Sequence, residues 1–431
     1  MMRTIPLRSV PAAPPPEAQG WRFERLLTAP HRLGFFGAAV WLALSALWWA
    51  GVLVARALGA EWPWAVAPGL AHGLLLSLSF MPLFIVGFLF TAGPRWLGQG
   101  EVPARRLLPA VLLMEGGWLL ALLGFHFGVP LAALGLTLAA AGWAKVSWDF
   151  LHLLRASRVP DRLHAQCVAG AALYGLLALA LAVFGLLMDT PTLVRAAIQL
   201  ALWGFLAPTF AVVSHRMIPF FTAAALPSLD AWRPNWLLVA MLSVLAASGL
   251  AAMATALWGP LPVALSALLA LLQLAAGALL LWLAVRWGLV QSLRGAGLRL
   301  LAMLHGGFVW LGLALLLAGL SHALQAFGGA GLGLAPLHAL TMGYLGCTLV
   351  AMITRVAAGH SGRPLAVDGL AWALYLLLQA AVLARVAAAL WPAAATALTL
   401  AAIAAWAVAC STWALRYGGW MGRPRVDGRP G

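Results

Sequence analysis

The feature that most constrains this chain is a series of apolar stretches, each about twenty residues or longer, separated by short polar connections. Hydrophobic residues make up 64% of the 431 positions and charged residues only 9%, whereas soluble domains are about a quarter charged. A helix needs about 20 apolar residues to cross a hydrocarbon layer about 30 Å thick. The sequence therefore predicts an all-α, polytopic integral membrane protein and excludes a soluble multidomain enzyme.

Twelve stretches are long enough to cross a membrane. We expect spans at residues 34–58, 68–92, 107–127, 129–153, 164–188, 194–221, 235–256, 261–287, 300–324, 336–358, 369–390 and 393–417. The predicted organisation is a disordered tail over residues 1–30, a twelve-helix bundle over 31–417 and a C-terminal tail over 418–431. No apolar segment precedes the Pro-rich part of the first tail, so we do not expect a cleaved signal peptide.

The basic residues indicate how the chain is oriented. The sequence has 26 Lys+Arg against 11 Asp+Glu, a formal net charge of +15. The two tails and the connections after even-numbered spans hold 22 of these 26 cations. The positive-inside rule then places both termini in the cytoplasm. We interpret the charge as a topology signal, which disfavours a nucleic-acid partner and leaves the lipid bilayer as the expected one.

The ten histidines are the most informative polar residues, because ionisable groups inside a span are costly. At the outer level are His72, His126, His322 and His338, and at the inner level His31, His152, His164, His215, His305 and His360. Neutral imidazole binds heme iron and copper. His72 and His338 are our first choice for a pair of axial heme ligands, and His322 is close enough in sequence to approach the same layer. For any single histidine the alternative is an interfacial or hydrogen-bonded residue. The three cysteines form no CxxC pair, so neither a disulfide framework nor a zinc site is indicated.

Two further groups of polar residues lie inside the predicted spans. Lys145, Asp149 and His152 share one helical face, since they are four and three residues apart. They are interpreted either as an intramembrane ion pair or as part of a proton path. Glu115 is an isolated carboxyl group at mid-depth, expected to be a buried neutral acid, a proton carrier or the partner of Lys145.

The inner end of the sixth span contains His215, Arg216 and Pro219. Pro219 is expected to kink or end the helix, and Arg216 either anchors the span or grips an anionic group such as a heme propionate. Related endings recur at the second and tenth spans. Because these spans are four apart, a threefold repeat of four helices is conceivable.

Several segments, taken in order, resemble the NnrS family. The most distinctive read LHALTMGYLG (337–346), MITR (352–355) and GHSGRPL (359–365). The others read GFLFTAGPRW (87–96), RMIPFFT (216–222) and LHG (304–306), the last followed by Trp310. The resemblance implies a twelve-spanning protein of the bacterial inner membrane that contains heme, expected to be of the b type, and copper. It also implies a role in the response to nitric oxide and nitrosative stress in denitrifying metabolism, with nitric oxide or iron–nitrosyl species as partners.

The histidines that match the family's pattern by position are His72, His305, His338 and His360. The arginines that match it are Arg216, Arg355 and Arg363. In this hypothesis His305, His215 and His360 form an inner metal site or hydrogen-bond an arginine that binds a propionate. No residue is assigned a catalytic role. The chain departs from the family where residues 70–74 read LAHGL, because one histidine and an acidic residue of the usual run are missing, and a copper site that needs both would be altered. His215 also replaces the usual glycine before Arg216.

Two other classes stay open as alternatives. Twelve spans and the charges at Lys145, Asp149 and Glu115 also suit a proton-coupled secondary transporter of a small solute. The sequence shows no pair of visibly broken helices at matching positions in two halves. A heme–copper oxidase subunit is ranked last, because no two histidines are adjacent in the sequence.

Overall fold

The computed structural model describes residues 20–429, apart from the side chain of Ala296, and every regular element in that part is a helix. The twelve spans are α1 (Pro30–Ala57), α2 with α3 (Pro68–Leu78, Phe80–Trp96), α4 (Ala104–Phe127), α5 (Val129–Ala156), α6 (Leu163–Leu187), α7 with η3 and α8 (Pro191–Leu200, Ala201–Leu206, Ala207–Ala225), α9 (Asn235–Trp258), α10 (Val263–Arg286), α12 (Arg299–Ala326), α13 with η5 and α14 (Ala335–His338, Ala339–Gly346, Cys347–His360), α15 (Gly369–Leu390), and η6 with α16 (Pro392–Ala394, Ala395–Met421). Three short helices, η2 (Phe23–Thr28), α11 (Leu289–Ser292) and η4 (Ala296–Leu298), lie outside the spans. The predicted all-α fold with twelve membrane-spanning helices is confirmed.

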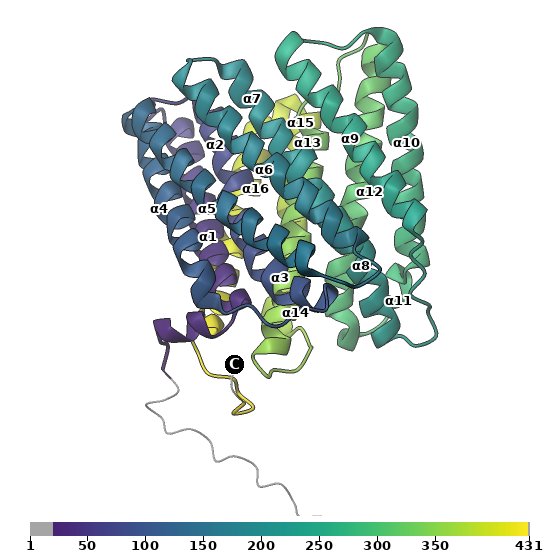
Figure 1. Ribbon diagram of the computed structural model, residues 1–431. Coiled ribbons are helices and arrows are strands. Elements are labelled where there is room, and N and C mark those ends of the chain that lie inside the picture. Colours follow the sequence, from purple (N-terminus) through teal and green to yellow (C-terminus); the bar gives the residue numbers. More distant parts are fainter. Residues whose placement is uncertain (1–19, 430–431) are drawn as a thin grey trace, which may run out of the picture.

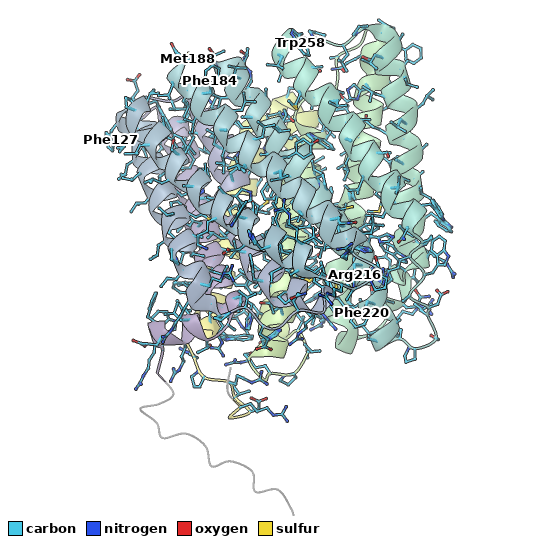
Figure 2. All side chains as sticks on the ribbon, viewed as in Figure 1. Phe127, Phe184, Met188, Arg216, Phe220 and Trp258 are labelled. Atoms are coloured by element: carbon cyan, nitrogen blue, oxygen red, sulfur yellow. The ribbon has the colours of Figure 1, made fainter. Side chains whose placement is uncertain are left out.

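The spans stand side by side as one bundle, with the described ends of the chain at the same end (Figure 1). We call this the termini-bearing end and the opposite one the far end. Figure 2 shows Arg216 and Phe220 near the termini-bearing end, and Phe127, Phe184 and Trp258 at the far end. Which side of the membrane each end faces stays a prediction.

Neighbouring spans pack closely where small residues remove side-chain bulk. At the interface of α4 with α5, a Cβ on Gly117, Gly124 or Gly135 would collide with the backbone of the facing helix. Small residues of this kind let helices approach in a membrane, where lipid tails are as apolar as the side chains. The α9–α10 hairpin turns at Gly259, whose φ of +89° is readily adopted only by glycine.

Four spans form the inside of the bundle. Buried residues make up 89% of the most apolar stretch of span 2, 78% in spans 6 and 10 and 72% in span 9, against 33–44% in the other eight. Spans 2, 6 and 10 are also the interrupted ones. Ser79 separates α2 from α3, and η3 and η5 are π-helical segments within spans 6 and 10. The interruption therefore recurs every four spans in the most buried positions, whereas the sequence alone had revealed no broken helices.

Local sequence explains these interruptions. Pro82 and Pro208 have no N–H to donate to the carbonyls four residues earlier, next to Ser79 and inside η3 respectively. In η5 two tryptophans pack against glycines instead, since a Cβ on Gly343 would collide with Trp310 and a Cβ on Gly346 with Trp406. Pro219, by contrast, does not end its helix, because α8 continues to Ala225.

The chain ends pack onto the bundle more than the sequence suggested. Residues 1–19 lie outside the described residues, so their predicted disorder stays a prediction. Residues 23–28 form η2, with Leu26 buried, and α16 continues to Met421, past the predicted boundary at residue 417. Arg32 donates hydrogen bonds of 2.8 Å to the carbonyls of Met421 and Arg423, so α1 holds the end of α16.

Candidate functional site

Two histidines on separate spans, His72 on α2 and His338 on α13, lie within electrostatic range of each other towards the far end. Their side chains interact electrostatically. The His72 ring stacks on Trp49 of α1 with centroids 4.0 Å apart, and its buried Nδ1 has no hydrogen-bond partner in the structure. His338 Nδ1 lies 3.0 Å from the carbonyl oxygen of Leu334, so a proton there leaves Nε2 free. A histidine whose second nitrogen donates to a backbone carbonyl is oriented as a metal ligand commonly is.

The same group contains a cation that the sequence analysis did not single out. Arg385 on α15 interacts electrostatically with both His72 and His338, and its side chain is half-buried. No ion pair between described residues involves it. The signal was present in the sequence, because an arginine inside an apolar span is costly and marks a candidate functional position.

His322 does not join this outer pair, which corrects the sequence prediction. Its Nδ1 lies 2.9 Å from Oε1 of Gln273 on α10, and Gln273 Nε2 donates to the hydroxyl of Ser248 on α9 at 2.9 Å. A buried amide needs partners for both its oxygen and its nitrogen. His322 is therefore held by the α9–α10 hairpin, as one member of a row of hydrogen bonds with Gln273 and Ser248.

The inner histidines also differ from the prediction, because His215, His305 and His360 lie in three separate clusters. The first joins His215 on α8 with His164 at the start of α6, through a contact of 3.0 Å between His164 Nε2 and His215 Nδ1. His215 Nε2 contacts the carbonyl oxygen of Pro234 at 3.2 Å. Because the carbonyl oxygen can only accept, a neutral His215 carries its proton on Nε2, and its Nδ1 accepts the hydrogen bond that His164 Nε2–H donates.

The other two clusters are formed by His305 and His360. His305 on α12 is fully buried, its Nε2 lies 3.2 Å from the hydroxyl of Thr222 on α8, and its Nδ1 has no partner. His360, at the end of α14, packs on His31 of α1 with ring centroids 4.2 Å apart. His31 was not among the predicted site residues. It is buried and its Nδ1 also has no partner.

The three predicted anion-binding arginines share one arrangement, with each guanidinium over an aromatic ring. Arg216 lies over Trp96, Arg355 over Phe221 and Arg363 over Trp420, at 4.9, 3.9 and 4.1 Å from the ring centroids. None of the ion pairs between described residues involves them. Stacking holds the plane of a guanidinium and leaves its edge accessible to an anion. At that edge, Arg216 Nη1 also contacts His164 Nδ1 at 3.5 Å. Outside the spans, burial and the neighbouring cations Arg423 and Arg416 lower the pKa of Arg363.

The charged group on α5 contains the ion pair predicted from its spacing. Lys145 Nζ lies 2.7 Å from Asp149 Oδ2, and Arg106 at the start of α4 lies 3.0 Å from Oδ1. Two cations therefore hold one buried carboxylate. The second cation, Arg106, lies in what the sequence had suggested was the connection between the second and third spans. His152 is exposed and contacts the carbonyl oxygen of Trp148 instead.

Glu115 is not the partner of Lys145. Its Oε2 accepts a hydrogen bond of 2.6 Å from the indole Nε1 of Trp41 on α1. Gly37 lies against the same carboxyl group, and a Cβ at that position would occupy the space of Oε1. The acid is thus held between α1 and α4.

The histidine nitrogens fit heme, whose iron needs few protein ligands, better than they fit a bare metal ion, which needs several. Among residues 20–429, no group of three or more His, Cys, Asp and Glu is placed to hold a metal ion. Heme iron needs only one or two protein ligands, since the macrocycle supplies the rest. His72 and His338 supply two imidazoles, each with a nitrogen that has no protein partner.

These features define a class: a polytopic α-helical membrane protein whose histidines lie near one another on separate spans. Residues 25–425 match the family described as NnrS protein, so the chain belongs to the NnrS family. No curated protein matches the sequence.

Proposed function

We propose that this chain is a heme protein of the inner membrane that acts in the response to, or tolerance of, nitric oxide and nitrosative stress. The observation that carries the proposal is the pair His72 and His338, two imidazoles from separate helices within electrostatic range of each other, each with a nitrogen that has no hydrogen-bond partner. Membership of the NnrS family supports the physiological role.

In this proposal the chain's own residues have distinct tasks. His72 and His338 bind the iron of a b-type heme, and Trp49 fixes the His72 ring by stacking. The hydrogen bond to the Leu334 carbonyl oxygen keeps the His338 proton on Nδ1. Arg385 compensates negative charge beside the pair. When bound, the heme would supply an iron centre, and because two imidazoles fill both remaining positions, a small ligand would have to displace one of them.

Copper has weaker support. The pair His164 and His215 offers two nitrogens, but they contact each other at 3.0 Å and no third donor of the usual kinds joins them. A hydrogen bond joins these two nitrogens, so a metal ion held by both would have to replace the proton between them. We therefore place copper second to heme and at this inner pair.

A purified preparation tests the proposal directly. The protein is isolated in detergent from heme-replete cells, followed by a pyridine-hemochrome spectrum and metal analysis. We expect a b-type heme spectrum, a spectral change on addition of nitric oxide, and greater nitric oxide sensitivity in cells that lack the chain. A colourless and metal-free preparation would contradict the proposal.

A proton-coupled transporter is the second candidate, favoured by the interrupted spans, because transporters build their sites from discontinuous helices. The interruptions fall in spans 2, 6 and 10, however, and not at matching places in two halves. This candidate predicts proton-coupled solute uptake into vesicles that is lost in Asp149→Asn.

A further inference from the structure

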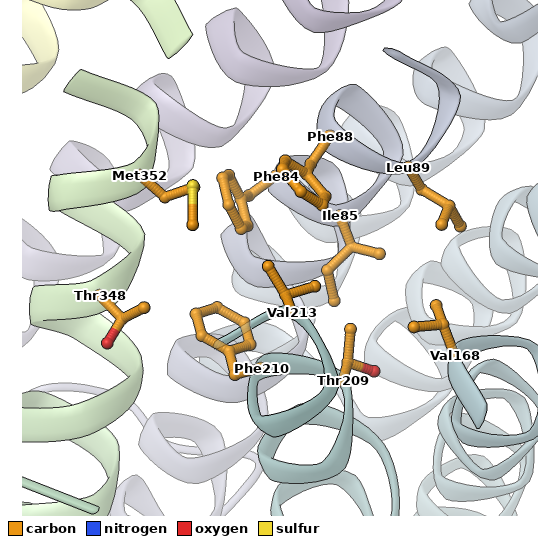
Figure 3. Close-up of a pocket in the computed structure, with 10 residues that line it drawn as sticks. All are labelled: Phe84, Ile85, Phe88, Leu89, Val168, Thr209, Phe210, Val213, Thr348 and Met352. Atoms are coloured by element: carbon orange, nitrogen blue, oxygen red, sulfur yellow. The ribbon is translucent and has the colours of Figure 1, made fainter. Parts of the chain in front are cut away.

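A small cavity lies at the centre of the bundle, where α3, α8 and α14 meet with one residue from α6. Figure 3 shows the side chains that line it: Phe84, Ile85, Phe88, Leu89, Val168, Thr209, Phe210, Val213, Thr348 and Met352. Its volume is about 20 Å³. The three helices that supply most of its wall each follow the interruption of their span. The cavity is therefore enclosed by the three interrupted spans.

The wall of the cavity is made of hydrocarbon even where threonines contribute. The Thr209 hydroxyl donates to the carbonyl oxygen of Phe205 at 2.7 Å. The Thr348 hydroxyl faces Gly307 of α12 and has no hydrogen-bond partner in the structure, so it is the single unpaired polar side-chain group among the lining residues. Figure 3 shows a methyl group of each threonine directed towards the cavity. All the lining residues are buried except Val213, which is half-buried.

Chemistry and size together restrict what this cavity holds. A buried water molecule needs two to four polar partners, and wholly apolar cavities stay dry and bind apolar guests. The volume of about 20 Å³ exceeds the roughly 10–15 Å³ that one water-sized molecule requires and is far below the roughly 150 Å³ of a cavity that takes benzene. The guest that fits is a single uncharged molecule of a few atoms at most.

We propose that this cavity is a binding site for an uncharged diatomic gas inside the membrane. The site goes beyond the proposed function, because it uses none of the histidines and needs no cofactor. Such a gas dissolves in the hydrocarbon of the bilayer, so it reaches the bundle from the lipid without passing a charged surface. Nitric oxide and dioxygen both belong to this class.

Dioxygen is a suitable molecule for the test, because it is paramagnetic and speeds relaxation of nuclei very close to it. The full-length protein in nanodiscs carries ¹³C-labelled methionine methyl groups, with any bound iron held ferric so that it does not take up dioxygen. Met352 lines the cavity, whereas Met114 and Met303 are equally buried elsewhere. We expect the relaxation enhancement under dioxygen pressure to be several-fold larger at Met352 than at the other two.

A pair of variants controls for burial and for added bulk. Val168→Ile adds one methylene inside the cavity, and Val146→Ile adds one at a buried position of α5 away from it. We expect the first to reduce the enhancement at Met352 to the level of Met114 and the second to leave it unchanged. Equal enhancement at the three methionines of the unmodified protein would overturn the proposal, and so would an enhancement that Val168→Ile does not reduce. Neither result depends on heme content, so a failed gas site and a failed heme proposal are distinguishable.

Discussion

At the scale of the residue, the polar groups inside the bundle are held by specific partners. Asp149 is bound by two cations, and Glu115 by an indole N–H. The Lys145–Asp149 pair was predictable, because residues four apart on one helix lie side by side. The contribution of Arg106 and the Trp41–Glu115 bond were not, since they join different helices and depend on how these pack.

We expect the two cations beside Asp149 to substitute for each other. Lys145→Met or Arg106→Met alone should lower the free energy of unfolding by about 1 kcal/mol or less, because both cations are partly exposed and the other one remains. The double variant leaves a buried carboxylate without a cation and should cost about 3–5 kcal/mol. A double-mutant cycle in detergent measures the coupling.

Asp149→Asn in the double-variant background is the matched control, since it removes the charge that has lost its partners. It should recover most of the loss. Costs that simply add, with no recovery by the asparagine, would show that Arg106 and Lys145 do not share the carboxylate.

At the scale of the element, the existence of all twelve spans followed from hydropathy alone, and so did their order. The interruptions in spans 2, 6 and 10 did not, because a π-helical segment has the same apolar composition as the helix around it. Prolines account for the interruptions in spans 2 and 6, whereas the cause in span 10 is visible only in packing. Gly343, which reads in the sequence as one more small residue, makes room for the indole of Trp310.

Gly343→Ala therefore should destabilise the tenth span. Its Cβ would displace the Trp310 ring, whose Nε1 donates to Gln379 Oε1 at 2.8 Å, and overpacking of this kind costs about 1–3 kcal/mol. Gly116→Ala on the exposed face of α4 meets only open space and should be neutral or stabilise by up to about 1 kcal/mol. Thermal unfolding of the two variants in the same detergent compares them, and equal midpoints would argue against the close packing of η5.

At the scale of the whole molecule, the sequence placed His72 and His338 at one level, and in the structure the two lie within electrostatic range of each other. The sequence could not predict that the inner histidines separate into three clusters. Depth along a span follows from counting residues, whereas the direction in which a side chain points around the helix axis depends on neighbours. The pairing of His164 with His215 and of His31 with His360 arises from that rotation.

The orientation of the bundle gives a separate prediction at this scale. The basic connections place both chain ends in the cytoplasm. A fluorescent protein that folds only in the cytoplasm should be bright when fused after residue 431. A periplasmic phosphatase reporter should be active when inserted beside Asp189, in the connection between α6 and α7. The opposite pattern would reverse the proposed topology.

The ligands of the proposed heme provide the most direct test of the central claim. Electron paramagnetic resonance of the ferric protein should show a low-spin signal typical of two imidazole ligands. His72→Ala and His338→Ala should each convert the iron to high spin or lose the heme. His126→Ala, which removes a far-end histidine bonded to Trp48, should leave the signal unchanged. Full heme content and an unaltered low-spin signal in both His72→Ala and His338→Ala would contradict the account.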